Sequence, residues 1–236
     1  MITATRLDLS RRDPDLRELM DDPACDPRRL AATYARFGVV NRLVSAWGRV
    51  YRQLLRPELQ RLGRPARVLD LGSGGGDVVR RLATLARADG LQVTWTGADP
   101  DPRALDAAQR TSTPGVAFVQ ATSSELRHAG ERFDAVLSNH VLHHLDDDEL
   151  QVFAADSLAV STGPVLHGDI ARSAGAYGLY AVGITPLAPG TFLRTDGLRS
   201  IRRSYTPAEL QPVLGSDWRV ESPAAFRLLA VGRGRG

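Results

Sequence analysis

The sequence predicts an α/β domain built around a mostly parallel sheet. From residue 66 onward, apolar runs of four to seven residues alternate with longer stretches of helical pattern. Strands and helices of these lengths in alternation form a parallel sheet with helices on both faces. Near the C-terminus the alternation stops, and two short apolar runs joined by residues 222–225 predict an antiparallel pair of strands.

The N-terminal part of the chain differs from this pattern. Residues 1–26 are polar and rich in Asp and Pro, which predicts an irregular arm. Through residues 27–62 apolar side chains recur at spacings of three and four, which predicts one or two amphipathic helices. Gly38 is the expected break and Pro57 the expected restart, because glycine and proline commonly mark helix ends.

The remaining elements follow in order. Strands are expected at 67–70, 92–98, 116–120, 133–138, 164–170, 218–221 and 226–231, and helices at 77–88, 102–110, 147–160 and 206–214. Residues 173–193 carry no charge and are long enough to span a bilayer, but their four glycines and two prolines favour a flexible lid. We therefore expect a helical cap at 1–64 and a larger domain at 65–236, with a lid inserted at about 171–203.

The amino-acid composition limits the class of protein and the cellular compartment that we expect. Hydrophobic residues make up 43% and charged residues 24%, which is typical of a folded globular domain. The single cysteine, Cys25, excludes an intrachain disulfide and a cysteine-based zinc site. The charged N-terminus lacks the apolar core of a signal peptide, so a cytoplasmic protein is expected.

Basic residues are concentrated in one segment. Residues 28–64 hold nine arginines and one acid, a balance that could attract nucleic acid or a membrane surface. However, the arginines recur at spacings that separate them from the apolar stripe, which favours a solvated helix face. We expect no nucleic-acid partner, no membrane partner, and a monomer or homodimer.

A glycine-rich loop follows the first expected strand, with the sequence DLGSGGGD at residues 70–77. Glycine lets a backbone approach a ligand closely. A dinucleotide fingerprint needs glycine at the sixth position from Gly72, where this chain has Asp77. A carboxylate there would oppose a pyrophosphate at the helix N-terminus, so the loop disfavours NAD.

The next strand ends in Asp99, and a carboxylate there accepts hydrogen bonds from ribose hydroxyls in nucleotide-binding folds. With the runs VLDLGSGGG at 68–76, TGADP at 96–100 and FDAVLSNH at 133–140, the chain resembles class I S-adenosylmethionine-dependent methyltransferases of the small-molecule type. The resemblance extends over about residues 64–170. It implies a Rossmann-like, seven-stranded, mostly parallel sheet with a terminal antiparallel strand, and S-adenosyl-L-methionine as the cofactor.

The resemblance also implies the residues that bind the cofactor, namely Asp70, Gly72, Gly74, Gly76, Asp99, Pro100, Thr122, Ser123 and Asn139. The glycines would line the methionine part, Asp99 the ribose, and Asp70 and Asn139 the amino-acid end. Many relatives carry an acid after the third strand that accepts from the adenine amino group. Here Thr122 or Ser123 stands in that place, and a hydroxyl would replace the carboxylate.

Three histidines, His140, His143 and His144, follow the fourth expected strand, at the edge of the sheet where α/β proteins bind ligands. Imidazole titrates near neutral pH and can take the proton of a phenol. Residues 141–147 resemble the LHDWxD segment of small-molecule O-methyltransferases, whose histidine is the general base. His143 falls on that histidine, and His140 and His144 remain alternatives. The histidines could also bind a metal, but without a clear carboxylate as third ligand we expect none.

The resulting interpretation is O-methylation of a small aromatic or hydrophobic hydroxyl acceptor, as in secondary metabolism. The residues expected to contact that acceptor are His140, Arg172, Tyr177 and Tyr180. A C-methyltransferase of the quinone-biosynthesis type is the alternative, because the run NRLVS at residues 41–45 resembles that group. A dinucleotide-dependent oxidoreductase and a non-catalytic cofactor-binding partner are more distant alternatives.

Overall fold

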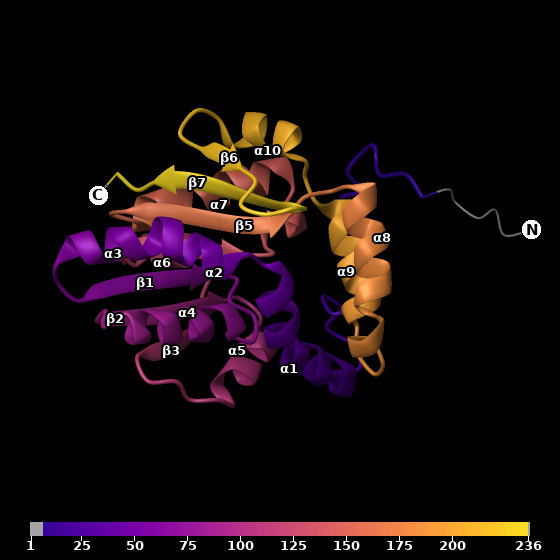
Figure 1. Cartoon of the computed structure of the whole chain (residues 1–236), viewed down its shortest axis with the longest axis horizontal. Coiled ribbons are helices and arrows are strands. Elements are labelled where there is room, and N and C mark those ends of the chain that lie inside the picture. Colours follow the sequence, from indigo (N-terminus) through magenta and orange to yellow (C-terminus); the bar gives the residue numbers. More distant parts are fainter. Residues whose placement is uncertain (1–6, 236) are drawn as a thin grey trace, which may run out of the picture.

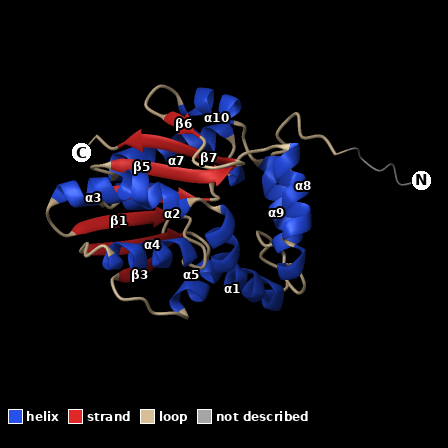
Figure 2. Ribbon diagram, viewed as in Figure 1, coloured by secondary structure: helices blue, strands red, loops and turns tan. Residues whose placement is uncertain are grey.

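A seven-stranded sheet lies at the centre of the structure, a computed structural model that describes residues 7–235 (Figures 1 and 2). The strands have the order β3-β2-β1-β4-β5-β7-β6. Their bounds are β1 Ala66–Leu71, β2 Val93–Asp99, β3 Val116–Gln120, β4 Ala135–Asn139, β5 Pro164–Ile170, β6 Arg219–Glu221 and β7 Arg227–Arg233. The first five are parallel, and β7 is antiparallel to both β5 and β6, so the predicted fold class is confirmed.

Helices cover both faces of this sheet. One face packs against α2 Trp47–Val50, the π-helical segment η1 Tyr51–Leu55, α3 Arg56–Leu62 and α4 Asp77–Ala88. The other face packs against α6 Ser123–His128, α7 Asp147–Val160 and α10 Pro207–Leu214. All seven residues of β5 are buried, as expected of a central strand covered on both sides. Helix α5, Pro102–Gln109, lies beside β2 and β3. The short helix α6 was not predicted from the sequence.

The predicted cap divides into two parts with different roles. Helix α1, Pro27–Val44, passes through Gly38 without the predicted break, since one glycine costs a helix only about 1 kcal/mol. The chain turns instead at Ala46, which has a left-handed φ of 60°. After this turn Trp47, Tyr51 and Leu55 are buried in the same core as the sheet. Residues 47–62 are thus built into the sheet domain, and only the part before Ala46 extends away from it.

The predicted lid is a helical pair that stands beyond the carboxyl edge of the sheet (Figure 1). It consists of α8 Ala174–Gly183, the short 3-10 helix η3 Thr185–Leu187 and α9 Leu193–Arg203. Arg29 and Arg36 of α1 donate to the backbone carbonyls of Thr191 and Leu187, at 2.8 and 2.9 Å. These two arginines therefore join α1 to the lid, instead of forming the solvated helix face that their spacing predicted. Within residues 7–235, no helix is both long and apolar enough to cross a membrane.

Candidate functional site

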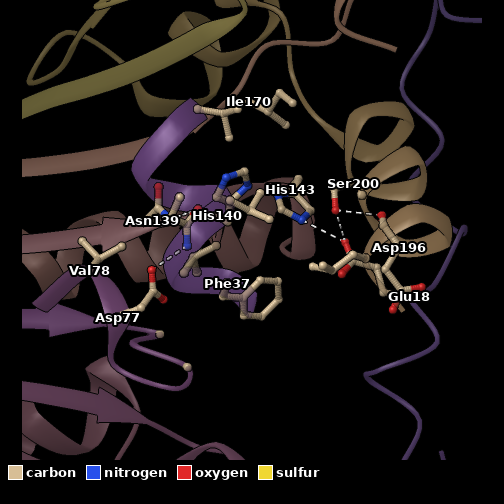
Figure 3. Close-up of a pocket in the computed structure, with 18 of the residues that line it drawn as sticks. Glu18, Phe37, Asp77, Val78, Asn139, His140, His143, Ile170, Asp196 and Ser200 are labelled. Carbon is tan, nitrogen blue, oxygen red and sulfur yellow. Dashed lines mark hydrogen bonds and ion pairs between the residues drawn. The ribbon is translucent and has the colours of Figure 1, made fainter. Parts of the chain in front are cut away.

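A cavity of about 890 Å³ opens between the carboxyl edge of the sheet, the N-terminal arm, α1 and the lid. The glycine loop lines one part, and the histidine cluster and the lid helices line another. Figure 3 shows Asp77 and Asn139 on one side of this cavity and His143 and Glu18 on the other, with Phe37 between them in that view. One continuous space therefore connects six of the nine predicted cofactor residues to the predicted base.

The topology explains why acidic and amide side chains converge here. Strands β1, β2, β4 and β5 run in parallel, so their carboxyl ends share one edge of the sheet. Asp70, Asp99, Asn139 and Asp169 all lie at or next to these ends. Ligands of open α/β sheets bind at this edge.

The glycine loop bends sharply around the cavity wall. Gly72 and Gly74 line the cavity and have φ angles of 66° and 51°, in the left-handed region that favours glycine. A Cβ atom at Gly72 would lie 2.5 Å from Cγ2 of Val141. Gly76 differs from the expectation, because a Cβ atom there would point at the ring of Phe118 and the residue does not line the cavity.

Two carboxylates beside the loop have different environments. Asp99 accepts hydrogen bonds from the backbone amides of Gly74 and Asp101, at 2.8 and 3.0 Å. Asp70 is 1% exposed, and its Oδ1 has no hydrogen-bond partner among the described residues. Burial, with the nearby charges of Asp77 and Asp99, raises the pKa of Asp70 to about 8. An unpaired buried carboxylate at the cavity wall fits a cationic group such as the ammonium of the predicted cofactor.

A chain of hydrogen bonds ties α1 to this part of the site. Trp47 Nε1 donates to Asn139 Oδ1 at 3.0 Å, and Asn139 Nδ2 donates to Asn41 Oδ1 at 3.4 Å. Asn41 Nδ2 in turn donates to Asp77 Oδ2 at 3.0 Å. Asn41 was noticed in the sequence only as part of a family-like run, and its contact with the loop requires the folded position of α1.

The residues proposed for the adenine contact lie outside the cavity wall. Thr122 is the N-cap residue of α6, and its hydroxyl donates to the carboxylate of Glu125 and accepts from the amide of the same residue. The hydroxyl of Ser123 donates to Asp156 at 3.1 Å. Neither residue lines the cavity, so the structure gives the predicted adenine contact no support.

His143 is held between two carboxylates in the turn after β4. Its ring is buried, and Nδ1 lies 2.9 Å from Oδ1 of Asp169, whose Oδ2 accepts the backbone amide of His143. On the other side, Nε2 lies 3.1 Å from Oε1 of Glu18. Burial alone would lower the pKa of His143, but the two carboxylates outweigh it and raise this pKa to about 9.

The other two histidines lie on either side of His143. Nε2 of His140 accepts from Arg227 at 3.0 Å, and burial, with that cation, lowers the pKa of His140 to about 3. A neutral ring whose free nitrogen already accepts a hydrogen bond is a poor base. His144 is partly exposed, with Nε2 at 3.8 Å from Glu18 and Nδ1 at 3.4 Å from Asp21.

The residues expected to contact the acceptor are only partly brought together. His140 and Tyr180 line the cavity, but Tyr177 and Arg172 do not. Arg172 is 4% exposed and donates to the carbonyls of Leu9 and Ser204 and to Glu209. Its role is to fix the arm against α10, which corrects the expectation of a substrate contact.

Glu18 was not among the site residues predicted from the sequence. This residue lies in the polar arm, 125 positions before His143, and nothing in its neighbourhood resembles a motif. Yet it is buried in the structure, with its Oε1 also accepting from Ser200 of α9 at 2.6 Å. Only a signal of long-range contact could have revealed it.

Comparison with known proteins agrees with this geometry. Residues 68–161 match the family model described as a methyltransferase domain. The chain is 32% identical over 157 residues to the ubiquinone biosynthesis O-methyltransferase of Azorhizobium caulinodans, covering 64% of this chain and 57% of that protein. The Brucella ovis protein of the same name is 31% identical over 120 residues, covering 50% and 46%. The matches thus span about half the length of these curated relatives.

Solved structures with the same fold are more distant in sequence. The plantazolicin methyltransferase BpumL, in complex with SAH, superposes with a TM-score of 0.60 at 12% identity, covering 89% of this chain and 95% of that one. The magnesium protoporphyrin IX methyltransferase of Synechocystis PCC 6803 gives 0.54 at 17% identity, covering 85% of both.

Strand order, glycine loop and the matched model together define a methyltransferase fold of class I. Within this fold, residues 68–161 are the part that matches the methyltransferase domain, and the similarity to the ubiquinone biosynthesis O-methyltransferases covers about half the length of those proteins.

Proposed function

We propose that this protein transfers a methyl group from S-adenosyl-L-methionine to the hydroxyl oxygen of a small, hydrophobic, aromatic acceptor. The observation that carries the proposal is the single cavity that joins the glycine loop and the unpaired Asp70 to the buried pair of His143 and Asp169. A methyl donor and an acceptor must share one enclosed space for an in-line displacement, which depends on positioning.

The cofactor would lie along the glycine loop. Asp70 would accept from its ammonium group, and Asp99 from its ribose hydroxyls, while Gly72 and Gly74 allow close approach of the backbone. When bound, the cofactor supplies an electrophilic methyl group on a sulfonium. Asn41 and Asn139, linked by a hydrogen bond, would help to hold its amino-acid end.

The acceptor would lie between α1 and the lid. This part of the cavity wall is mainly apolar, with Phe37, Val40, Leu43 and Val44 from α1 facing Leu179, Tyr180, Ile184, Leu187 and Leu193 of the lid segment. Burial of apolar surface at about 25 cal/mol per Å² favours a hydrophobic acceptor in such a space. Leu43 and Leu179 line the cavity and are also largely exposed to solvent. An apolar acceptor would therefore contact apolar side chains as it enters the cavity.

The transfer step needs a place for the proton of the acceptor hydroxyl. When the acceptor oxygen replaces Glu18 at Nε2 of His143, this nitrogen can take that proton, and Asp169 stabilises the resulting imidazolium through Nδ1. The cofactor, when bound along the glycine loop, would supply the methyl group: a bond from the acceptor oxygen to the methyl carbon would replace the bond from that carbon to sulfur, and sulfur would keep the electron pair as S-adenosylhomocysteine.

The names of the relatives support oxygen as the methylated atom, since the proteins of Azorhizobium caulinodans and Brucella ovis are both called O-methyltransferases. Carbon methylation of a quinone-type ring remains the second candidate, and the apolar cavity would accept such a ring equally well.

The proposal is tested by incubating the purified full chain with S-adenosylmethionine and a panel of phenols, catechols and hydroquinones of increasing apolar substitution. We expect methyl ethers among the products, with turnover that rises with apolar substitution. Methylation on ring carbon would select the second candidate. No methylated product from any acceptor, despite cofactor binding, would contradict the proposed acceptor class.

A further inference from the structure

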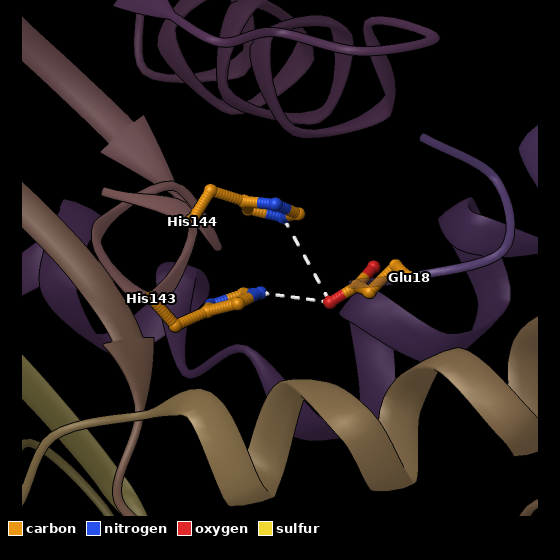
Figure 4. Close-up of side chains that lie close together, drawn as sticks. All are labelled: Glu18, His143 and His144. Carbon is orange, nitrogen blue, oxygen red and sulfur yellow. Dashed lines mark hydrogen bonds and ion pairs between the residues drawn. The ribbon is translucent and has the colours of Figure 1, made fainter. Parts of the chain in front are cut away.

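Three side chains that can bind a metal converge at the cavity wall (Figure 4). Glu18 reaches them from the N-terminal arm, and His143 and His144 come from the turn after β4. Oε1 of Glu18 lies 3.1 Å from Nε2 of His143 and 3.8 Å from Nε2 of His144. All three atoms lie within 4.8 Å of one another.

We propose that Glu18, His143 and His144 form a binding site for one divalent transition-metal ion of the Zn²⁺ type. Bonds of about 2.0–2.1 Å to a tetrahedral ion place neighbouring ligand atoms about 3.3 Å apart. The distances of 3.1 and 3.8 Å from Glu18 to the two histidines lie on either side of that value. A small rotation of the partly exposed His144 ring would bring its nitrogen closer.

The ring nitrogens that point away from the shared centre support this assignment. A histidine bound to a metal almost always donates its other N–H to a carboxylate, a carbonyl or water, which fixes the ring. Nδ1 of His143 lies 2.9 Å from Asp169, and Nδ1 of His144 lies 3.4 Å from Asp21. Each histidine therefore has a carboxylate behind it and its Nε2 turned toward Glu18, as a metal ligand requires.

The donor set selects the kind of ion. Two imidazole nitrogens and one carboxylate suit Zn²⁺, Co²⁺ or Ni²⁺, whereas Mg²⁺ and Ca²⁺ prefer oxygen ligands. Three protein ligands leave a fourth position of a tetrahedral ion free. Glu18, His143 and His144 all line the cavity, so that position is accessible to an acceptor oxygen.

An ion at this place would change how the acceptor loses its proton. Nε2 of His143 would be a ligand instead of a base, and the ion would lower the pKa of the hydroxyl bound to it. This role in catalysis rests on the proposed methyl transfer, whereas binding of the ion does not. From the sequence no metal was expected because the histidines lacked a clear carboxylate as third ligand, and Glu18 comes from the arm, 125 residues before His143 in the chain.

Metal binding is measured directly on the full chain after treatment with a chelator. Zn²⁺ is titrated by calorimetry, and the Zn²⁺ retained after dialysis is counted by mass spectrometry. We expect one ion per chain in the wild type, with affinity at least about 100-fold lower in Glu18→Gln and His144→Gln. Asp169→Asn should bind about 10–100-fold more weakly, since it removes only the partner of a ligand. His128→Gln, an exposed histidine outside the cavity, is the matched control and should bind as the wild type does.

Binding of S-adenosylhomocysteine is measured in the same samples and reports whether each variant is folded. If the wild type retains no Zn²⁺, or if Glu18→Gln and His144→Gln bind it as tightly as the wild type, the metal site is wrong. If Zn²⁺ binds as expected and no methyl transfer is found with any acceptor, the metal site stands and the proposed function fails.

Discussion

Oε1 of Glu18 lies 3.1 Å from Nε2 of His143, and this contact joins the N-terminal arm to the turn after the fourth strand. The carboxylate occupies the nitrogen that would otherwise face an acceptor. The arm is thereby part of the wall of the site, and its conformation decides which partner His143 has. Several consequences of this contact can be measured.

The stability of the metal-free protein should depend on pH through His143. Its pKa is raised from 6.5 to about 9, so the stabilisation from its charged form is complete below about pH 6.5 and is lost as the pH rises through 9. Glu18→Gln removes one of the two carboxylates, so its melting temperature should be lower than that of the wild type at pH 6.5. This difference should shrink toward pH 9.5. Melting curves of chelated protein test it, and a difference that is independent of pH would contradict the assigned ion pair.

Loss of the His143 imidazole should slow catalysis without weakening the binding of the cofactor. In the metal-free enzyme we expect His143→Gln to lower kcat about 10²–10⁴-fold, the usual contribution of a general base, with an unchanged Kd for S-adenosylhomocysteine. Higher pH should restore part of the rate, because a phenol with a pKa of about 10 then arrives ionised. His128→Gln serves as the control. Full activity of His143→Gln would exclude the base.

The wild-type pH profile provides an independent check on the same residue. A base must be neutral, and the raised pKa of His143 means that the neutral fraction grows until about pH 9. For metal-free enzyme kcat/KM, which reports the pKa values of the free enzyme, should therefore rise across pH 7–9 instead of levelling off near 6.5. A plateau of kcat/KM that begins below pH 7 would indicate that Glu18 and Asp169 do not raise the pKa of His143 in the free enzyme.

Asp70 should lower the stability of the unliganded protein and strengthen binding of the cofactor. Its buried, unpaired carboxylate has a pKa raised to about 8, so the unliganded fold loses stability as the pH rises from about 4 to 8. Asp70→Asn removes this charge and should raise the melting temperature of the unliganded protein at pH 8, by about 2–4 °C per kcal/mol regained. The same change should weaken the binding of S-adenosylhomocysteine at least about 10-fold. An unchanged affinity would mean that Asp70 does not contact the cofactor.

Removal of residues 1–26 should reduce methyl transfer to the acceptor much more than binding of the cofactor. This deletion takes away Glu18 but leaves α1 and the buried Trp47 in place. We expect the Kd for S-adenosylhomocysteine to stay within about 3-fold of wild type, while turnover falls by at least about 10²-fold through misplacement of the acceptor. Equal loss of both would show that the arm supports the whole fold.

Local signals in the sequence were sufficient for the sheet domain. The alternation of apolar runs and helices predicted the strands β1 to β5 and the helices α4, α5 and α7, though not α6, and Gly72 and Gly74 of the glycine-rich loop line the cavity. The errors concern features fixed by tertiary contacts. Gly38 was predicted to break a helix, but it lies inside α1, which is continuous to Val44. Arg172 was predicted to contact the acceptor, but it donates to the arm and to α10.

The candidate site shows the same division. His143 was found from a local resemblance, but its partners Glu18 and Asp169 come from segments 125 positions before it and 26 after it. No periodicity or motif links these positions, since only the fold brings the arm across the edge of the sheet. The pKa of His143, and with it the choice between base and metal ligand, therefore depends on residues that a local pattern does not connect.

Calorimetric titration of the full chain with S-adenosylhomocysteine, and separately with NAD, shows which cofactor the glycine loop binds. We expect one molecule of S-adenosylhomocysteine per chain, binding at least about 10-fold more weakly in Asp99→Ala and unchanged in the exposed control Asp106→Ala, with no heat from NAD. Binding of NAD without binding of S-adenosylhomocysteine would show that the loop holds a dinucleotide and that the protein is not a methyltransferase.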